Sequence, residues 1–502
     1  MQVSASRLQA ALRRCWPGLT EPGLAGDVPV RLVLDSRRIE PGDVFVAVPG
    51  VAGDGRSYLA EALQAGAIQV LFHLEPDEAL PDSAQGRPVL GLPFLRQRLG
   101  ELGRLLFDVP DSMQLIGVTG TNGKSSVTHY IAELSTALGR DAGLIGTLGV
   151  GRPGQLEDVG LTTPGPLALQ EALGALAMNG IDRVAMEVSS HALEQGRLDG
   201  CHVTAAAFTN LSRDHLDYHG SMAAYAAAKA RLFRRSELAL AVVNADDPLA
   251  RLMLAGLSDD ARVLAVGDDP AATLRVIDWQ PGRNGQLALV ATPQGERSLE
   301  LSLMGRFNLD NVLLAIATLH GLGESFDALF DAAAQLTPVP GRMQRVGHAG
   351  GPAVIVDYAH TPGALENALV ALRDHLPGDG RLWCVFGCGG DRDSGKRPLM
   401  GTAAARYADL LVITDDNPRS EDPGEIRQQT LVGVPVESAQ RCEVVAGRSE
   451  AIARTIAQAN DEDVILIAGK GHEPYQEIAG VRHAFSDVAE AEVALARRKE
   501  GQ

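Results

Sequence analysis

Short, uninterrupted apolar runs recur along the chain and alternate with stretches of helical spacing. A parallel strand is buried on both faces, so its sequence is continuously apolar. The alternation therefore predicts an α/β fold with doubly wound, mostly parallel sheets. The predicted strands are residues 30–34, 44–48, 114–119, 183–187, 203–209, 353–357, 382–386, 410–414 and 464–468.

Two parts of the chain depart from this rhythm. Residues 286–292 and 297–303 alternate apolar and polar side chains around Pro293-Gln-Gly-Glu296, which predicts a hairpin at an antiparallel edge. Residues 1–19 have the pattern of a surface helix and lack the apolar region of a secretory signal. Since no later run reaches the roughly 18 apolar residues of a membrane span, we expect a cytoplasmic protein without membrane insertion.

Two Pro-containing polar stretches, Asp108-Val-Pro-Asp-Ser112 and Leu336-Thr-Pro-Val-Pro-Gly341, each precede a change of pattern. A chain of 502 residues suggests about three domains at roughly 150 residues each. We therefore predict an N-terminal domain at residues 1–108, a central domain at 109–337 and a C-terminal domain at 338–502.

Composition narrows the function classes. The 45 Lys and Arg residues against 63 Asp and Glu residues give a formal charge of −18, which argues against a non-specific binder of nucleic acid or anionic membranes. The five cysteines are scattered and form no C-x-x-C pair, so we expect a reducing compartment and no disulfide scaffold.

The strongest local signal is Gly117-Val-Thr-Gly-Thr-Asn-Gly-Lys-Ser-Ser126, between a predicted strand and a predicted helix at residues 125–138. Backbone N–H groups of such a loop can surround a triphosphate, Lys124 can reach the terminal phosphates, and Ser125 can bind Mg²⁺. Val118 stands where the strict phosphate-loop pattern has Gly. A simple Gly-rich turn is the alternative, but the flanking strand and helix favour phosphate binding.

Three further residues are candidates for the site, and the sequence supports Glu187 better than the other two. Glu187 ends an apolar strand, and a carboxylate at that edge suits Mg²⁺ or its waters. His215 and Lys229, taken alone, have the pattern of surface residues.

Four polar clusters follow strands of the C-terminal part: Asp357-Tyr-Ala-His360, residues 387–393, Asp415-Asp-Asn-Pro-Arg419 and Gly469-Lys-Gly-His-Glu473. Each could be a solvated loop with a helix cap. Because parallel strands end at one edge of a sheet, four such clusters together predict a recognition site for a charged, polar ligand.

These motifs, in this order, resemble the signatures of the Mur ligase family over essentially the whole chain. The matching segments are residues 119–125, 187–191, 209–215, 305–311, 341–342 and 357–360. Residues 35–37, 162–163, 387–393 and 416–419 further resemble the members that join meso-2,6-diaminopimelate to UDP-N-acetylmuramoyl-L-alanyl-D-glutamate. The resemblance implies an ATP-dependent ligase of peptidoglycan precursor synthesis that forms an amide through an acyl phosphate.

The resemblance also implies a role for each matching residue. ATP would lie on Gly120, Thr121, Asn122, Gly123, Lys124, Ser125 and Ser126, with Asn308, Arg342 and Asp357 completing its site across the domain joint. Mg²⁺ would be held by Ser125, Glu187, His215 and Lys229, the last carbamylated in the family. The residues expected to act in catalysis are Lys124, Glu187, His215, Lys229 and Arg342.

The two organic substrates are small molecules, and the resemblance implies a site for each. The UDP-sugar, bound partly by the N-terminal domain, would contact Leu34, Ser36, Val51, Ala52, Gly53, Thr162, Thr163, Ser189, Gln195 and Arg197. Diaminopimelate, bound by the C-terminal domain, would contact Arg392, Asp416, Asn417, Pro418, Arg419, Gly469 and Glu473. We expect a monomer that binds no nucleic acid.

Three alternatives stay open. Folylpolyglutamate synthetases and lysine-adding ligases share the ATP-binding motifs; residues 416–419 disfavour the first, and Arg419 in particular disfavours the second. A phosphate-loop ATPase or nucleotide-dependent regulator would hydrolyse ATP without either co-substrate, whereas a ligase needs both.

Overall fold

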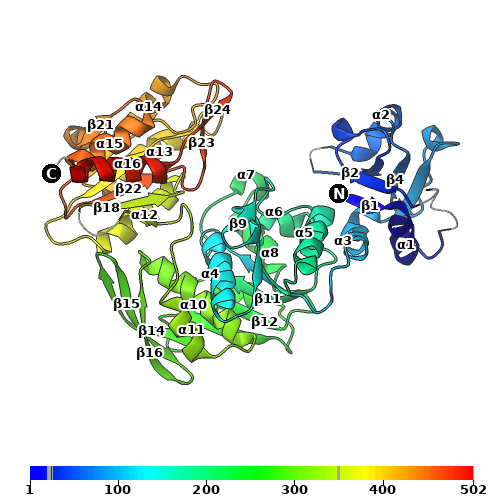
Figure 1. The fold of residues 1–502 in the computed structure, drawn as a ribbon, viewed down its shortest axis with the longest axis horizontal. Helices are drawn as coiled ribbons and strands as arrows, with labels where there is room; N and C mark the ends of the chain where they lie inside the picture. Colours follow the sequence, from blue (N-terminus) through cyan, green and yellow to red (C-terminus); the bar gives the residue numbers. More distant parts are fainter. Residues whose placement is uncertain (20–23, 25–26, 52, 348–350, 501–502) are drawn as a thin grey trace. The chain divides into compact units, whose positions relative to one another are not determined.

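The computed structural model describes residues 1–19, 24, 27–51, 53–347 and 351–500. The chain forms two compact units, one of Met1–Ala265 with Ala317–Gly323, the other of Val266–Ile316 with Glu324–Gln502. Figure 1 shows the helices and strands of both units, coloured along the sequence from blue to red. In the described ranges, no helix combines the length and apolar character needed to cross a membrane.

The first unit begins with a five-stranded sheet of order β1-β2-β3-β4-β5. Its α1 and α3 pack on one face and α2 packs on the other, so the sheet is buried on both sides. The strands are β1 (Gln2–Ser4), β2 (Pro29–Val33), β3 (Val44–Ala47), β4 (Gln69–Leu74) and β5 (Val89–Pro93). The helices are α1 (Ala5–Cys15), α2 (Leu59–Gln64), α3 (Leu95–Leu106), η1 (Ser36–Arg38), η2 (Gly55–Tyr58) and η3 (Asp82–Ala84).

Seven further strands of this unit pair in the order β12-β11-β6-β10-β7-β8-β9, and the pairing is parallel from β12 to β7. Apolar residues of α5, α6 and α8 form the core with one face of this sheet. The strands are β6 (Gln114–Thr119), β7 (Ala142–Gly146), β8 (Gly149–Arg152), β9 (Gln155–Glu157), β10 (Arg183–Glu187), β11 (Val203–Phe208) and β12 (Leu240–Asn244). The helices are α4 (Lys124–Ala137), α5 (Pro166–Met178), α6 (Ser190–Glu194), α7 (Leu216–His219), α8 (Met222–Ala230) and α9 (Ala250–Leu254).

The second unit contains an antiparallel ribbon, β14-β15-β16, which confirms the predicted hairpin at an antiparallel edge. Its elements are β14 (Leu274–Gly282), β15 (Gly285–Thr292), β16 (Gly295–Leu301) and α11 (Phe326–Ala333). Two elements span the unit boundary, β13 (Arg262–Gly267) and α10 (Arg306–Gly321).

The C-terminal sheet has the order β17-β18-β22-β19-β20-β21 and is parallel except for β17. Alternate residues of its strands face α12, α13 and α14 on one side and α15 and α16 on the other, as in a doubly wound sheet. The strands are β17 (Gln344–Val346), β18 (Ala353–Asp357), β19 (Leu382–Phe386), β20 (Leu410–Ile413), β21 (Cys442–Val444) and β22 (Val464–Ala468), followed by the hairpin β23 (Tyr475–Ile478) and β24 (Val481–Ala484). The helices are α12 (Pro362–Asp374), α13 (Lys396–Tyr407), α14 (Pro423–Leu431), η4 (Val436–Arg441), α15 (Arg448–Gln458) and α16 (Asp487–Glu500).

The predicted fold class is confirmed, and strands such as β6, β10, β18, β19 and β22 have the predicted bounds. The surface helix expected within residues 1–19 is α1, which buries one face and exposes the other, but it is shorter than expected because β1 precedes it. The domain boundaries at residues 108/109 and 337/338 stay a prediction.

Candidate active site

The phosphate loop follows β6 and needs glycine at its first position. Gly120 has a φ of +151°, and a Cβ there would lie 1.8 Å from Thr209 Oγ1. Gly123 caps α4 with a φ of +84°. L-residues with side chains rarely adopt these angles, so the loop conformation depends on both glycines. It leads directly into Lys124, Ser125 and Ser126 of α4.

The loop is held by the residues that follow β11. Asn210 Oδ1 accepts from Asn122 N (3.1 Å), its Nδ2 donates to Asn122 O (3.1 Å), and its carbonyl accepts from Thr121 N (2.8 Å). The Thr209 hydroxyl also donates to Asn122 O. The sequence analysis gave Thr209 and Asn210 no role in holding this loop, although both lie in the same motif as His215.

Lys229 lies on α8 with 1% of its surface exposed, and its Nζ donates to the Gly120 carbonyl at 2.7 Å. Burial holds the pKa of Lys229 well below its usual value; Lys124 lowers it further, and Asp214 opposes the shift. Lys124 Nζ donates to the carbonyls of Gly120 (3.0 Å) and Thr121 (2.9 Å). The structure thus brings both predicted lysines to one loop.

His215 begins a short turn of helix with a φ of +52°. Its side chain is half exposed, with Nε2 3.5 Å from Asp214 Oδ2. The ring centroid lies 5.0 Å from that of His191 and 6.0 Å from that of Tyr225. His215 therefore belongs to an aromatic cluster that also borders Lys229, whose Nζ lies 4.6 Å from the Tyr225 ring.

Glu187 ends β10 and is almost fully buried. Its carboxylate accepts from Thr147 N (2.9 Å) and Thr147 Oγ1 (3.3 Å), and Thr147 Oγ1 lies 3.0 Å from Thr162 Oγ1. The predicted metal-side carboxylate and a predicted substrate residue therefore share Thr147, which the sequence did not single out.

The other central residues predicted for the UDP-sugar form one network. Thr163 Oγ1 donates to Glu187 O (2.8 Å) and accepts from Ser189 N (3.1 Å). Arg197 donates to Thr163 O (2.7 Å) and, through two nitrogens, to Gln195 Oε1. These bonds fix the orientation of the guanidinium at the end of β10.

Some of the residues predicted to bind Mg²⁺ have side chains that suit this ion. The part of the chain that the structure describes contains no group of three or more His, Cys, Asp or Glu side chains able to hold a metal. Mg²⁺ in nucleotide sites commonly takes one or two protein oxygens, with substrate phosphates and water completing its shell. The Ser125 hydroxyl and the Glu187 carboxylate are such donors, whereas the His215 nitrogen suits Mg²⁺ less well.

The predicted N-terminal contacts lie just after β2 and β3, which pair in parallel. Leu34 and Val51 are exposed, Ser36 begins η1, and the Gly53 carbonyl accepts from Gly50 N (2.9 Å). Ala52 lies outside the described residues.

The second unit contains the other three predicted ATP residues. Asn308 is buried on α10, and its Nδ2 donates to Met304 O (2.9 Å). Asp357 ends β18 and accepts from the backbone N–H groups of Met343 (2.7 Å) and Ala359 (2.9 Å). Burial raises the pKa of the Asp357 carboxyl, and Arg342 partly opposes this rise.

The ends of β20 and β22 carry an acceptor cluster, which we define as Asp416, Asn417, Lys470 and Glu473. The Nζ of Lys470, which is fully buried, donates to Asn417 Oδ1 (3.0 Å) and Glu473 Oε2 (3.0 Å) and lies 3.7 Å from Asp416 Oδ1. Asn417 Nδ2 also donates to Glu473 Oε2 (2.9 Å). Sequence reasoning quoted Lys470 within its motif but gave it no role. Pro418 directly follows Asn417 of this cluster, and Gly469, with a φ of +119°, directly precedes Lys470.

Arg419 connects this edge to the loop after β19. Its φ is +52°, its Nη1 donates to Gly390 O (2.7 Å), and its Nε lies 3.6 Å from Glu477 Oε2. Arg392 is exposed on the same loop as Gly390. The structure therefore gathers the predicted diaminopimelate residues at one sheet edge; their roles stay a prediction.

Three family models match the chain in sequence order. The model described as Mur ligase family, catalytic domain, matches residues 31–105; Mur ligase middle domain matches residues 118–319; and Mur ligase, glutamate ligase domain, matches residues 341–471.

Individual proteins match over nearly the whole chain. A protein of Pseudomonas syringae pv. tomato named UDP-N-acetylmuramoyl-L-alanyl-D-glutamate--2,6-diaminopimelate ligase is 49% identical over 467 residues, 93% of this chain and 94% of that protein. A solved structure of an enzyme with the same name is 38% identical, with a TM-score of 0.71 over 99% of this chain and 100% of that chain. Mycobacterium tuberculosis folylpolyglutamate synthase, complexed with ADP and AMPPCP, shares the fold at 22% identity, with a TM-score of 0.60 over 81% of this chain and 95% of that chain.

Proposed function

Because the chain belongs to the Mur ligase family, we propose that it joins meso-2,6-diaminopimelate to UDP-N-acetylmuramoyl-L-alanyl-D-glutamate with ATP. The relatives at 49% and 38% identity carry the name of this activity. The product is a nucleotide-linked tripeptide, a precursor of peptidoglycan.

The proposal that diaminopimelate is the amino acid rests on the charge pattern at the ends of β20 and β22. Diaminopimelate has two ammonium and two carboxylate groups, so its site must present both signs of charge. Asp416 and Glu473 supply carboxylates, while Arg419 supplies a planar guanidinium suited to a carboxylate. Lysine lacks the second carboxylate and would leave this guanidinium without its substrate partner.

The reaction must first make a carboxylate reactive. The D-glutamate side-chain carboxylate attacks the γ-phosphorus of ATP, ADP leaves, and an acyl phosphate forms. The neutral amine of diaminopimelate then attacks the acyl carbon, and the tetrahedral intermediate expels phosphate to give the amide. The chain positions the reactants and stabilises charge without supplying a nucleophile.

We assign the stabilisation of phosphoryl charge to two cations of this chain. Lys124 starts α4 directly after the phosphate loop, and the Arg342 guanidinium stacks 4.6 Å from the centroid of the Tyr358 ring. Bound Mg²⁺ would add Lewis-acid stabilisation of the phosphates, and we assign Ser125 and Glu187 as its protein donors.

The environment of Lys229 supports carbamylation. Only a neutral amine takes up CO₂, and burial beside Lys124 lowers the pKa of Lys229. Carbamylation converts this neutral amine into an anion, which would offer oxygen atoms on the magnesium side of the loop.

Positional isotope exchange in ATP tests the acyl phosphate. Labelled bridging oxygen should scramble only when UDP-N-acetylmuramoyl-L-alanyl-D-glutamate is present, while mass spectrometry detects the tripeptide after diaminopimelate is added. Tripeptide formation without exchange would remove the acyl-phosphate step from the proposal. We further propose a cytoplasmic monomer with domain boundaries at residues 108/109 and 337/338.

A further inference from the structure

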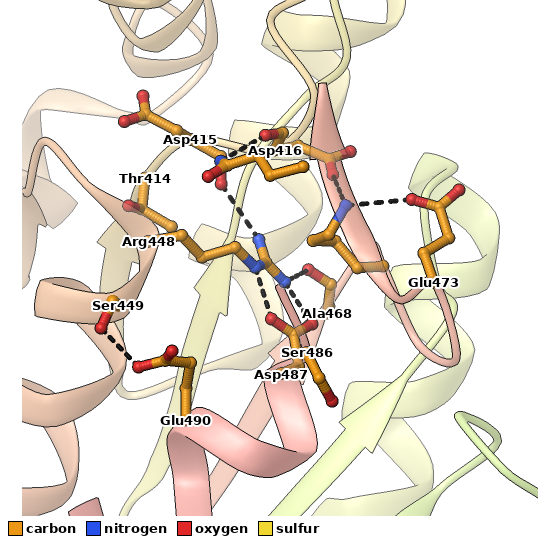
Figure 2. A network of polar contacts seen from close by, with 12 residues as sticks. Thr414, Asp415, Asp416, Arg448, Ser449, Ala468, Glu473, Ser486, Asp487 and Glu490 are labelled. Carbon is orange, nitrogen blue, oxygen red and sulfur yellow. Dashed lines mark hydrogen bonds and ion pairs between the residues drawn. The ribbon is translucent and has the colours of Figure 1, made fainter. Parts of the chain in front are cut away.

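A fully buried ion pair lies directly beneath the acceptor cluster. Arg448 and Asp487 have no exposed side-chain surface, and the guanidinium donates to both carboxylate oxygens, Nε to Oδ1 at 2.6 Å and Nη2 to Oδ2 at 2.7 Å. Arg448 begins α15 and Asp487 begins α16, so the pair also ties two helices together (Figure 2).

The same guanidinium holds the backbone where β20 and β22 end. Arg448 Nη1 donates to the Asp415 carbonyl (3.2 Å), and Nη2 donates to the Ala468 carbonyl (2.9 Å). Figure 2 shows Arg448 between these two carbonyls and the Asp487 carboxylate. The next residues along the chain are Asp416 and Gly469, so one side chain sets the spacing of two loops that form the acceptor cluster.

Asp415 is held from its side chain as well as from its backbone. Its Oδ2 accepts from Gly447 N (2.8 Å), and its Oδ1 pairs with Arg427. A cation in the first turn of a helix opposes the helix dipole, so α15 itself gains nothing from an arginine at position 448. The benefit of this arginine must therefore come from the groups that it joins.

We propose that Arg448 and Asp487 are positioning residues for the amino-acid acceptor site. This proposal rests on the proposed function and adds a specificity role for a pair that touches no substrate. Asp487 orients the guanidinium, and the guanidinium fixes the ends of β20 and β22, which sets where Asp416, Asn417 and Glu473 meet the incoming amine.

The first test is a matched comparison of two buried carboxylates at opposite ends of β22. Asp487→Asn breaks the pair near Ala468. Asp463→Asn breaks a comparable set, since Asp463 Oδ2 lies 3.3 Å from Arg381 Nη2 and accepts from Trp383 Nε1 (2.8 Å) just before β22 begins. Both variants should lower the unfolding temperature, because each leaves a buried arginine or indole without its partner.

Only Asp487→Asn should change amino-acid use. We expect its KM for diaminopimelate to rise about tenfold or more, because small misplacements of positioning groups weaken productive binding. Its KM values for ATP and the UDP-linked dipeptide should stay close to those of the parent, and all three should stay close to the parent in Asp463→Asn. Equal KM values for diaminopimelate in the two variants would overturn the proposal.

A double variant separates positioning from stability if Asp487→Asn folds poorly. Arg448→Met with Asp487→Leu replaces the ion pair by apolar groups, which often preserves or improves stability. The proposal expects a recovered unfolding temperature with a KM for diaminopimelate that remains raised. A recovered KM would show that the pair only stabilises the fold. A parent enzyme that forms no tripeptide would instead refute the proposed function.

Discussion

Lys124 and Lys229 donate to the same backbone oxygen, the Gly120 carbonyl, at 3.0 Å and 2.7 Å. Two charged ammonium groups that share one acceptor repel each other, and Lys229 is also buried. This geometry favours the neutral form of Lys229, which is the form that reacts with CO₂.

Replacing Lys229 by Arg should lower kcat about a hundredfold or more, because Arg cannot form a carbamate and keeps its charge beside Lys124. The parent enzyme should also lose activity in CO₂-depleted buffer and regain it with bicarbonate, measured as tripeptide formed per minute. Lys499→Arg, at an exposed position, serves as the control. Full activity of Lys229→Arg would contradict the carbamate role.

Replacing Gly120 by Ala should destabilise the protein by about 1 to 3 kcal/mol from backbone strain alone, with the clash against Thr209 adding to it. Urea denaturation measures this loss, and ATP binding should weaken as the loop shifts. Gly363→Ala is the matched control: it lies in α12 with nothing within 4 Å of the added Cβ. That change should stabilise by about 0.5 to 1 kcal/mol. Equal changes in stability for the two variants would contradict the claim that the loop conformation requires glycine at position 120.

Replacing Arg419 by Ala should weaken diaminopimelate use ten- to a hundredfold, which corresponds to about 1.5 to 3 kcal/mol for a charge-assisted contact. Arg419 donates to Gly390 through Nη1 and approaches Glu477 through Nε. The ratio of kcat/KM for diaminopimelate to that for lysine should therefore fall. If the parent already uses both amino acids equally, Arg419 is not the selecting residue.

Acid should destabilise the fold through His129 on α4. Burial lowers the pKa of this histidine to about 4, below the roughly 6.5 of an unfolded chain, so the folded state favours the neutral ring. The contribution to stability is complete above pH 6.5 and is lost as pH falls towards 4, by up to about 3 kcal/mol.

Urea denaturation at pH 7 and pH 4 measures this loss. His129→Gln should lose less stability than the parent between these values. His202→Gln, at an exposed position, should lose as much as the parent. Equal losses in all three proteins would assign the acid sensitivity to other groups.

Much of the fold was predictable because its central strands are buried on both faces. The runs that form β6, β10, β18, β19 and β22 are apolar in their interiors, and their bounds agree with the prediction. The strands β8 and β9, at one end of their sheet, are short and contain one apolar side chain each, so nothing local distinguishes them from loops.

The candidate site was predictable where chemistry lies in contiguous motifs, such as Lys124 or Asn417. Lys470, Arg448 and Asp487 were not assigned roles, because their partners come from distant parts of the sequence. A buried charge takes its meaning from tertiary contacts, which no local pattern supplies.

Phosphate release from ATP, measured with each co-substrate omitted in turn, tests the central claim most directly. The account predicts release only when UDP-N-acetylmuramoyl-L-alanyl-D-glutamate and meso-2,6-diaminopimelate are both present, and much slower release when lysine replaces diaminopimelate. Full-rate release with neither co-substrate, or an equal rate with lysine, would contradict it.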